Sequence, residues 1–161
     1  MSLWYSFSTE LKNRTLAAVI FLIISSIAYA FDSPGTIEIR LGQTVYQVEL
    51  ALTPAQRRKG LMHREQLERN AGMLLVYPKS GDHRVWMKNM RIPLRVLWID
   101  DRYKVLHIMR LEPCQLSPCP VFSAPVPARY ILELSDDNHK VEPGDIIEGL
   151  NVLWRSGDVC C

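Results

Sequence analysis

Several signatures of common protein classes are missing from this sequence. It has no glycine-rich phosphate-binding loop and no nucleophile elbow, so it carries no motif of a nucleotide-binding enzyme or of an α/β-hydrolase. It has no heptads and no internal repeat, which argues against a coiled coil or a solenoid. The net charge is only +2 and there is no basic stripe, which argues against a nucleic-acid partner. Motifs therefore assign no catalytic residue, no metal ligand and no cofactor.

A long transmembrane run is also missing, and the first 30 residues instead predict a signal peptide. Lys12 and Arg14 precede an apolar run at residues 15–27, and the sequence Ala-Tyr-Ala at residues 28–30 matches a signal-peptidase site. The run is shorter than the roughly 20 residues of a membrane span. No cysteine stands directly after it to carry a lipid. We expect cleavage after Ala30 and export to the periplasm or the extracellular space; the alternative is an uncleaved N-terminal membrane anchor.

Residues 31–161 are expected to form a single domain with a core at 36–150 and a short C-terminal tail. Alternating apolar and polar residues at 36–41 are typical of a half-buried strand, and the same pattern follows after a glycine turn. The continuous apolar run at 96–99 is typical of a strand buried on both faces. The predicted strands cover residues 36–41, 45–51, 73–76, 83–87, 96–99, 103–111, 130–134 and 146–150.

Few residues are left for helices. Thr53 suits a helix N-cap, Pro54 suits the first helical position, and Gly60 suits the end of the helix. Successive hairpins favour antiparallel pairing, and closure of a sheet into a barrel removes its exposed edges. We therefore predict a β-rich α+β fold, with a mostly antiparallel sheet closed into a compact barrel and one or two short helices.

Cysteine is absent before residue 114, so all four cysteines fall in the part predicted to be exported, where disulfides form. Cys114 and Cys119 lie in a long connection, residues 112–129, that holds five of the ten prolines. A disulfide between these two residues would stiffen the connection into an ordered rim loop. Their spacing is wider than that of a redox-active Cys-x-x-Cys pair. The pairing of Cys160 and Cys161 stays open.

The stretch at residues 86–100 combines aromatic, thioether, amine and amide groups with the apolar strand that follows. Lysine and asparagine next to tryptophan are costly to bury without partners, so these side chains are expected to line a surface recess. Donors outnumber acceptors there, which favours an anionic or carbonyl-rich small molecule or peptide as ligand. Alternatively, the lysine and the asparagine only cap a turn before the proline. The predicted ligand-binding residues are Arg64, Trp86, Met87, Lys88, Asn89 and Pro93.

The order and spacing of short motifs resemble domain-of-unknown-function family 192 over about residues 36–150. The resemblance implies a compact β-rich barrel, often exported, with no established reaction. Arg95 stands where the family usually has aspartate, and Met90 where it often has threonine or serine, so the resemblance implies no acid–base role at residue 95. The matching segments are residues 60–64, 72–74, 86–89, 92–94, 99–100, 112–114, 119–120, 127–130 and 132–134.

Two other functions remain as alternatives to a binding module. Thioether, imidazole and thiolate groups suit copper(I), although methionine also fills gaps in apolar cores. A hydrolase-type enzyme would need a base, an amide and a cation, but the sequence shows no recognisable nucleophile. The candidate metal ligands are Met62, Met73, Met87, Met90, His63, His83 and Cys114, and the candidate enzyme groups are Arg64, His83, Lys88, Asn89 and Asp100.

Overall fold

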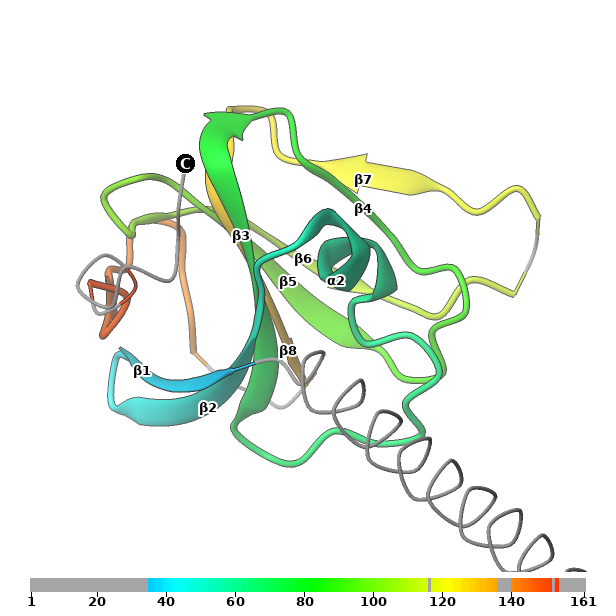
Figure 1. Ribbon diagram of the computed structural model, residues 1–161, viewed down its shortest axis with the longest axis horizontal. Coiled ribbons are helices and arrows are strands. Elements are labelled where there is room, and N and C mark those ends of the chain that lie inside the picture. The colour runs from blue at the N-terminus through cyan, green and yellow to red at the C-terminus, as the bar shows by residue number, and fades with distance from the viewer. Residues whose placement is uncertain (1–34, 116, 136–139, 152, 154–161) are drawn as a thin grey trace, which may run out of the picture. The chain divides into compact units, whose positions relative to one another are not determined.

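A computed structural model of the chain describes residues 35–115, 117–135, 140–151 and 153 (Figure 1). The predicted signal peptide at residues 1–30, and Cys160 and Cys161, lie outside these residues. Within the described ranges, no helix is both long and apolar enough to cross a membrane.

The domain is built around a seven-stranded sheet with the strand order β6-β5-β8-β3-β2-β1-β9, and β4 and β7 form a separate two-stranded ribbon (Figure 1). All pairs are antiparallel except β2 and β3, which are parallel and are joined by a crossover that contains α2. The elements are β1 Thr36–Leu41, β2 Thr44–Ala51, α2 Pro54–Lys59, β3 Ala71–Gly81, β4 Arg84–Trp86, β5 Leu94–Ile99, β6 Val105–Leu111, β7 Val121–Ser123, β8 Ala128–Ser135 and β9 Ile147–Glu148.

The sheet curls into a half-barrel and does not close, so the prediction of a closed barrel is wrong, whereas the β-rich α+β class is consistent with the structure. The two edge strands, β6 and β9, meet only at an isolated bridge between Lys104 and Ile146 and a few backbone hydrogen bonds near it. The physical reason is the length of β9, whose two residues cannot form a ladder along the seven residues of β6.

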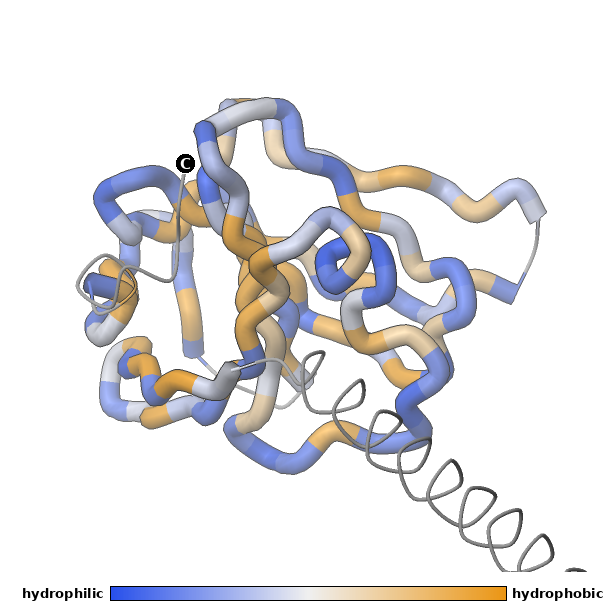
Figure 2. Tube along the Cα trace, viewed as in Figure 1, coloured by the Kyte–Doolittle hydropathy of each residue, from blue (hydrophilic) through white to orange (hydrophobic). Residues whose placement is uncertain are grey.

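Both faces of the sheet are covered by apolar side chains, and the hydrophobic residues follow the strands (Figure 2). Successive side chains of a strand point to opposite faces. In β8, Leu132 and Leu134 pack in one core, with Leu74 and Leu97, while Ile131 packs in the core on the other face. The same alternation places Glu133 on the second face.

The short helix α2 has the ends that the sequence predicts. The Thr53 side chain accepts a hydrogen bond from the Gln56 backbone N–H, and the Gln56 side chain accepts one from the Thr53 backbone N–H, which completes a capping box. Gly60 ends the helix at φ 48°, a value that glycine adopts easily. None of the six helical residues is buried, and α2 is held to the sheet by Arg57, which donates to the carbonyl oxygen of Val76 in β3, and by the buried Leu61 after the helix.

The two strands of the ribbon, β4 and β7, lie far apart in the sequence, and the sequence-based prediction does not pair them. Trp86 pairs with Val121 and Val85 with Phe122, so the long connection contains a strand that the sequence pattern does not reveal. The predicted disulfide between Cys114 and Cys119 is present in this connection. Both cysteines lie between the end of β6 and the start of β7, so the disulfide closes a short loop within this connection.

Candidate functional site

A pocket of about 430 Å³ lies between α2, the ribbon and one face of the sheet. Its volume is within the range of small-molecule sites, roughly 300–1,000 Å³. Leu61, Leu75 and Val85 are buried and form its inner apolar wall, whereas Trp86 and Val121 are exposed and stand at its edge. Trp86 and Val121 are directly opposed in the β4–β7 ribbon, and directly opposed residues of paired strands point to the same face. Both side chains therefore stand at the same edge of the pocket.

Four cationic side chains also line the pocket: Arg57, Arg58, Lys59 and Arg84. Two of them have partners within the protein. Arg57 Nη1 donates to the carbonyl oxygens of Leu52 and, at 2.8 Å, Val76, while Arg84 Nη2 forms an ion pair with Asp82 at 2.6 Å. Arg58 and Lys59 are exposed, and in the described part of the chain neither makes a side-chain hydrogen bond or an ion pair.

Arg57 and Tyr77 form a fixed part of the pocket wall. The guanidinium carbon of Arg57 lies 4.8 Å from the centroid of the Tyr77 ring, within the range of a cation–π contact. Partial burial lowers the pKa of Arg57 and raises the pKa of the Tyr77 phenol. The ordinary pKa of arginine lies far above 7, so Arg57 remains charged at neutral pH. The ordinary pKa of tyrosine also lies well above 7 and is raised here, so Tyr77 remains neutral.

Glu133 is the one carboxyl group in the pocket lining. It comes from the centre of the sheet, where it stands opposite Met73 of β3 and Val96 of β5, and only 8% of it is exposed. Its Oε2 atom has no hydrogen-bond partner among the described residues. Burial raises the pKa of Glu133 to about 7, although the positive charge of Arg64 acts in the opposite direction.

The space next to this carboxyl group is kept open by a glycine. A Cβ atom on Gly60 would lie 3.4 Å from Glu133 Oε2, at van der Waals contact. Gly60 directly follows Lys59 in the chain, so the end of α2 brings the pocket cations and the buried carboxyl group to the same place. The resulting site has apolar walls, a positively charged side and a single acidic group inside.

Comparison with known proteins identifies the family of this domain. The family model DUF192, described as "Uncharacterized ACR", matches residues 37–149. The chain belongs to the DUF192 family. A comparison with curated proteins found no match.

Two crystal structures are similar to this DUF192 protein. One, from Sinorhizobium meliloti 1021, is described as a "putative transcription regulator"; it is 32% identical with a TM-score of 0.67, and the match covers 73% of this chain and 95% of that one. The other, a protein of unknown function from Novosphingobium aromaticivorans DSM 12444, is 26% identical with a TM-score of 0.64, covering 70% and 84%. The family membership that the sequence motifs predict is thus confirmed.

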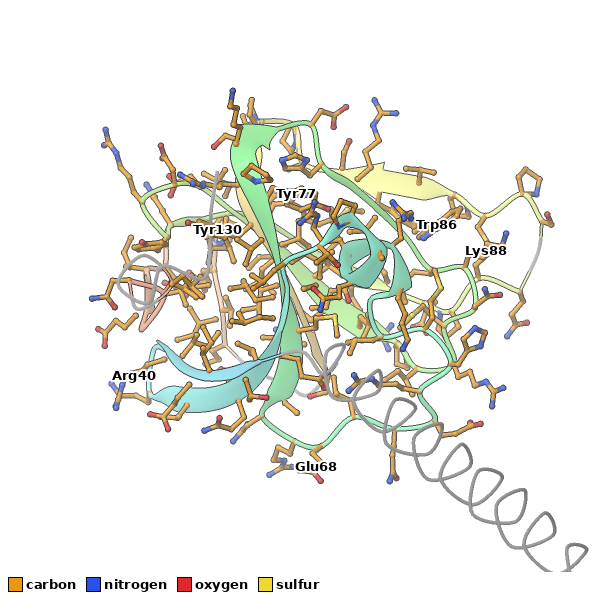
Figure 3. The ribbon with its side chains drawn as sticks, in the orientation of Figure 1. Arg40, Glu68, Tyr77, Trp86, Lys88 and Tyr130 are labelled. Atoms are coloured by element: carbon orange, nitrogen blue, oxygen red, sulfur yellow. A yellow bond between two sulfur atoms is a disulfide. The ribbon has the colours of Figure 1, made fainter. Side chains whose placement is uncertain are left out.

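The structure brings two of the predicted ligand-binding residues of the DUF192 domain together. Trp86 lines the pocket with 43% of its surface exposed, and Lys88 Nζ lies 5.4 Å from the centroid of its ring. Figure 3 shows these two side chains close together at the right of the view, with Tyr77 nearer the top. Lys88 itself is exposed and belongs to the turn after β4 rather than to the pocket lining.

The other predicted residues lie outside the pocket lining. Arg64 is bound to Glu49 through both guanidinium nitrogens, at 2.5 and 2.7 Å, and this hydrogen bonding raises the pKa of Arg64. Met87 is buried in the core, and Pro93 is half-buried before β5. Asn89 is exposed in a turn with φ 59°, and its Nδ2 atom lies 3.9 Å from the sulfur of Met62.

The candidate soft-metal ligands are distributed over several environments. Met73, Met87 and Met90 are buried in the core, and Met62 and Met90 line the pocket. Cys114 belongs to the disulfide. The remaining candidates are His63, exposed with φ 66°, and His83, whose ring stacks on Tyr77 with the centroids 3.5 Å apart. Over the described ranges, no three His, Cys, Asp or Glu side chains group as metal ligands.

Glu133 and the cations of α2 are site residues that the sequence-based prediction did not include. One signal for Glu133 was present in the sequence, because it is the only charged residue in the apolar run from Tyr130 to Leu134. A strand buried on both faces has no solvent-exposed position for such a residue. The cations of α2 carried no comparable signal, since a basic last turn also complements the helix dipole.

Proposed function

We propose that this DUF192 domain is a binding module for a small organic anion with an apolar body. The anion binds in the pocket between α2 and the β4–β7 ribbon. The observation that carries the proposal is the pocket of about 430 Å³, in which buried apolar walls are combined with four cationic side chains. Binding sites for small molecules typically have this composition, with mostly apolar surface and a few polar groups that orient the ligand.

The distribution of charge favours an anion. Arg58 and Lys59 lie on one side of the pocket and Arg84 comes from the ribbon on the other side. Helix-dipole stabilisation accounts for cations at the end of α2, but it does not account for Arg84. A carboxylate or phosphate group in the pocket would gain charge-assisted hydrogen bonds from Arg58 and Lys59, which otherwise face solvent, while Arg84 keeps its ion pair with Asp82.

Trp86 supports the apolar part of the proposal. Large aromatic side chains that stay exposed beside a pocket are common contact residues in binding sites, because they offer a wide and rigid apolar surface. The nearby Lys88 ammonium adds positive charge at the same edge. A net charge of +2 offers little of the basic surface that DNA phosphates require, so the description of the Sinorhizobium protein is not extended to this chain.

The proposal is tested with 3-phenylpropionate, which has one ring and one carboxylate, and with its uncharged amide. Binding is followed through the NMR signal of the Trp86 indole N–H. We expect the carboxylate to bind about tenfold more tightly than the amide. A double variant, Arg58→Ala with Lys59→Ala, should lose this preference. The control Arg102→Ala, in the exposed turn after β5, should keep it. Equal binding of both compounds, or of neither, would contradict the proposal.

A second candidate function is soft-metal binding, because two thioethers, Met62 and Met90, line the same pocket. Copper(I) is titrated under anaerobic conditions into the parent protein and into a variant carrying Met62→Leu and Met90→Leu. Leucine roughly preserves volume and apolarity, so the variant should fold. Tight binding that is lost in the variant would favour the metal function, and binding to neither protein would leave the anion site ahead.

A further inference from the structure

Glu133 occupies a position where an apolar side chain would fit the fold. Its neighbours across the strands, Met73 and Val96, are both buried, and Ile131, two residues earlier, packs in the core on the same face. A buried carboxyl group destabilises the folded protein unless a hydrogen-bond donor satisfies it. Because Glu133 also lines the pocket, a bound ligand can supply this donor.

Arg64, whose charge acts on Glu133, and Arg57, which lines the same pocket, are engaged elsewhere. Arg64 acts on Glu133 through its charge, but its guanidinium nitrogens donate to Glu49. Arg57 donates to backbone carbonyl oxygens. Tyr77 is coupled to Glu133 only through charge, since no hydrogen bond joins them in the described part of the chain. The protein therefore places the positive charge of Arg64 near the carboxyl group but gives its Oε2 atom no donor among the described residues.

We propose that Glu133 accepts a hydrogen bond from a hydroxyl group of the bound anion, so that the pocket takes a small 2-hydroxycarboxylate with an apolar body. This inference rests on the anion-binding function proposed above and specifies the class of its ligand. The carboxylate of the ligand meets Arg58 and Lys59, and its hydroxyl group meets Glu133.

The charges around the pocket favour a hydroxyl group over an ammonium group as the donor. Four cations line the pocket, and Arg64 adds a fifth positive charge that acts on Glu133. Arg84 and Arg64 are each paired with a carboxylate, but Arg57, Arg58 and Lys59 form no ion pair in the described part of the chain. These three cations would repel an ammonium group, whereas a neutral hydroxyl group donates a hydrogen bond without that repulsion. The hydrogen bond is also charge-assisted when Glu133 is ionised.

The position of Gly60 favours a short spacing between the two ligand groups. Gly60 connects Lys59 to Leu61, a residue of the inner wall. A Cβ atom on Gly60 would lie 3.4 Å from Glu133 Oε2, at van der Waals contact. The backbone that carries Arg58 and Lys59 therefore adjoins the acceptor at Gly60. A 2-hydroxycarboxylate carries its carboxylate and its hydroxyl group on adjacent carbons, and in the proposed complex these two groups lie across this point.

The test compares 3-phenyllactate with 3-phenylpropionate, which differ only in the 2-hydroxyl group. We expect the parent protein to bind 3-phenyllactate about tenfold more tightly. Glu133→Leu should bind both compounds equally, and Glu133→Gln, which retains an acceptor but no charge, should show an intermediate preference. The control Glu68→Leu lies in an exposed loop far from Trp86 and Tyr77 in Figure 3 and should keep the full preference.

The outcomes separate this inference from the binding function. If 3-phenylpropionate binds and 3-phenyllactate binds no better, the hydroxyl acceptor is refuted while the anion site stands. If neither compound binds the parent protein, both proposals fail. Phenylalanine, which replaces the hydroxyl by an ammonium group, is the third probe, and tighter binding of phenylalanine than of 3-phenyllactate would also refute the assignment. Thermal melting of each variant confirms that it is folded.

Discussion

Replacing Glu133 by glutamine should make the protein more stable above pH 7. In the folded protein the Glu133 carboxyl group is buried between Met73 and Val96, and its pKa is raised to about 7. In the unfolded chain it returns to its ordinary value of 4.5. Between these two pH values the folded state binds more protons than the unfolded state, so stability falls as the pH rises. Glutamine does not ionise and removes this loss.

The magnitude follows from the two pKa values. One pKa unit corresponds to about 1.4 kcal/mol, so a change from 4.5 to about 7 amounts to about 3 kcal/mol. This stability is fully present below pH 4.5, is lost as the pH rises through 7, and stays lost above it. A typical domain is stable by only about 5–15 kcal/mol, so the effect is large enough to measure.

Urea unfolding of the parent and of Glu133→Gln at pH 5, 6, 7 and 8 tests this expectation. The difference between the two free energies of unfolding should change by most of the calculated amount over this range, with the variant becoming relatively more stable as the pH rises. The control Glu68→Gln, in an exposed loop, should follow the parent at every pH. If the parent and Glu133→Gln show the same dependence on pH, the carboxyl group is not held in the desolvated state described here.

Further expectations concern other parts of the chain. Thr53→Ala should lower the free energy of unfolding by about 1 kcal/mol, measured by urea denaturation, because it removes half of the capping box of α2. Mass mapping without reductant should find one peptide joined through Cys114 and Cys119, and free thiols at both positions in protein from its native compartment would contradict the structure. N-terminal sequencing of the exported protein should begin at Phe31; an intact Met1 on a membrane-bound form would support the anchor instead.

Local pattern was sufficient to predict most of the elements. The strand Thr36–Leu41 has the predicted bounds because its alternation of side chains is regular, and α2 begins and ends as Thr53 and Gly60 indicate. The strand predicted at residues 73–76 is too short, because β3 extends to Gly81 past a break in its register with β8. The extension past residue 76 is paired with β8 again only at Gly81, opposite Ala128, and no local pattern encodes that distant partner.

The site depended more on long-range contacts. Trp86 and Lys88 could be placed together because they are only two residues apart in the sequence, and the turn after β4 keeps Lys88 Nζ 5.4 Å from the centroid of the Trp86 ring. Arg64 could not be placed relative to these two residues, because its position is set by Glu49, a partner on β2 that sequence spacing does not identify. Glu133 becomes a site residue only through the order of the strands, which places β8 in the middle of the sheet.

The place of β8 also determines when the domain can assemble. β8 lies between β3 and β5, so every strand pair that joins the first half of the sheet to β5 and β6 runs through residues 128–135 (Figure 1). Until these residues are available, β1–β3 and β5–β6 are two separate pieces, each with an unpaired edge and an uncovered apolar face. Contacts between such distant segments form slowly. The complete sheet of this topology therefore cannot form until residues 128–135, near the end of the sheet's sequence, have been synthesised.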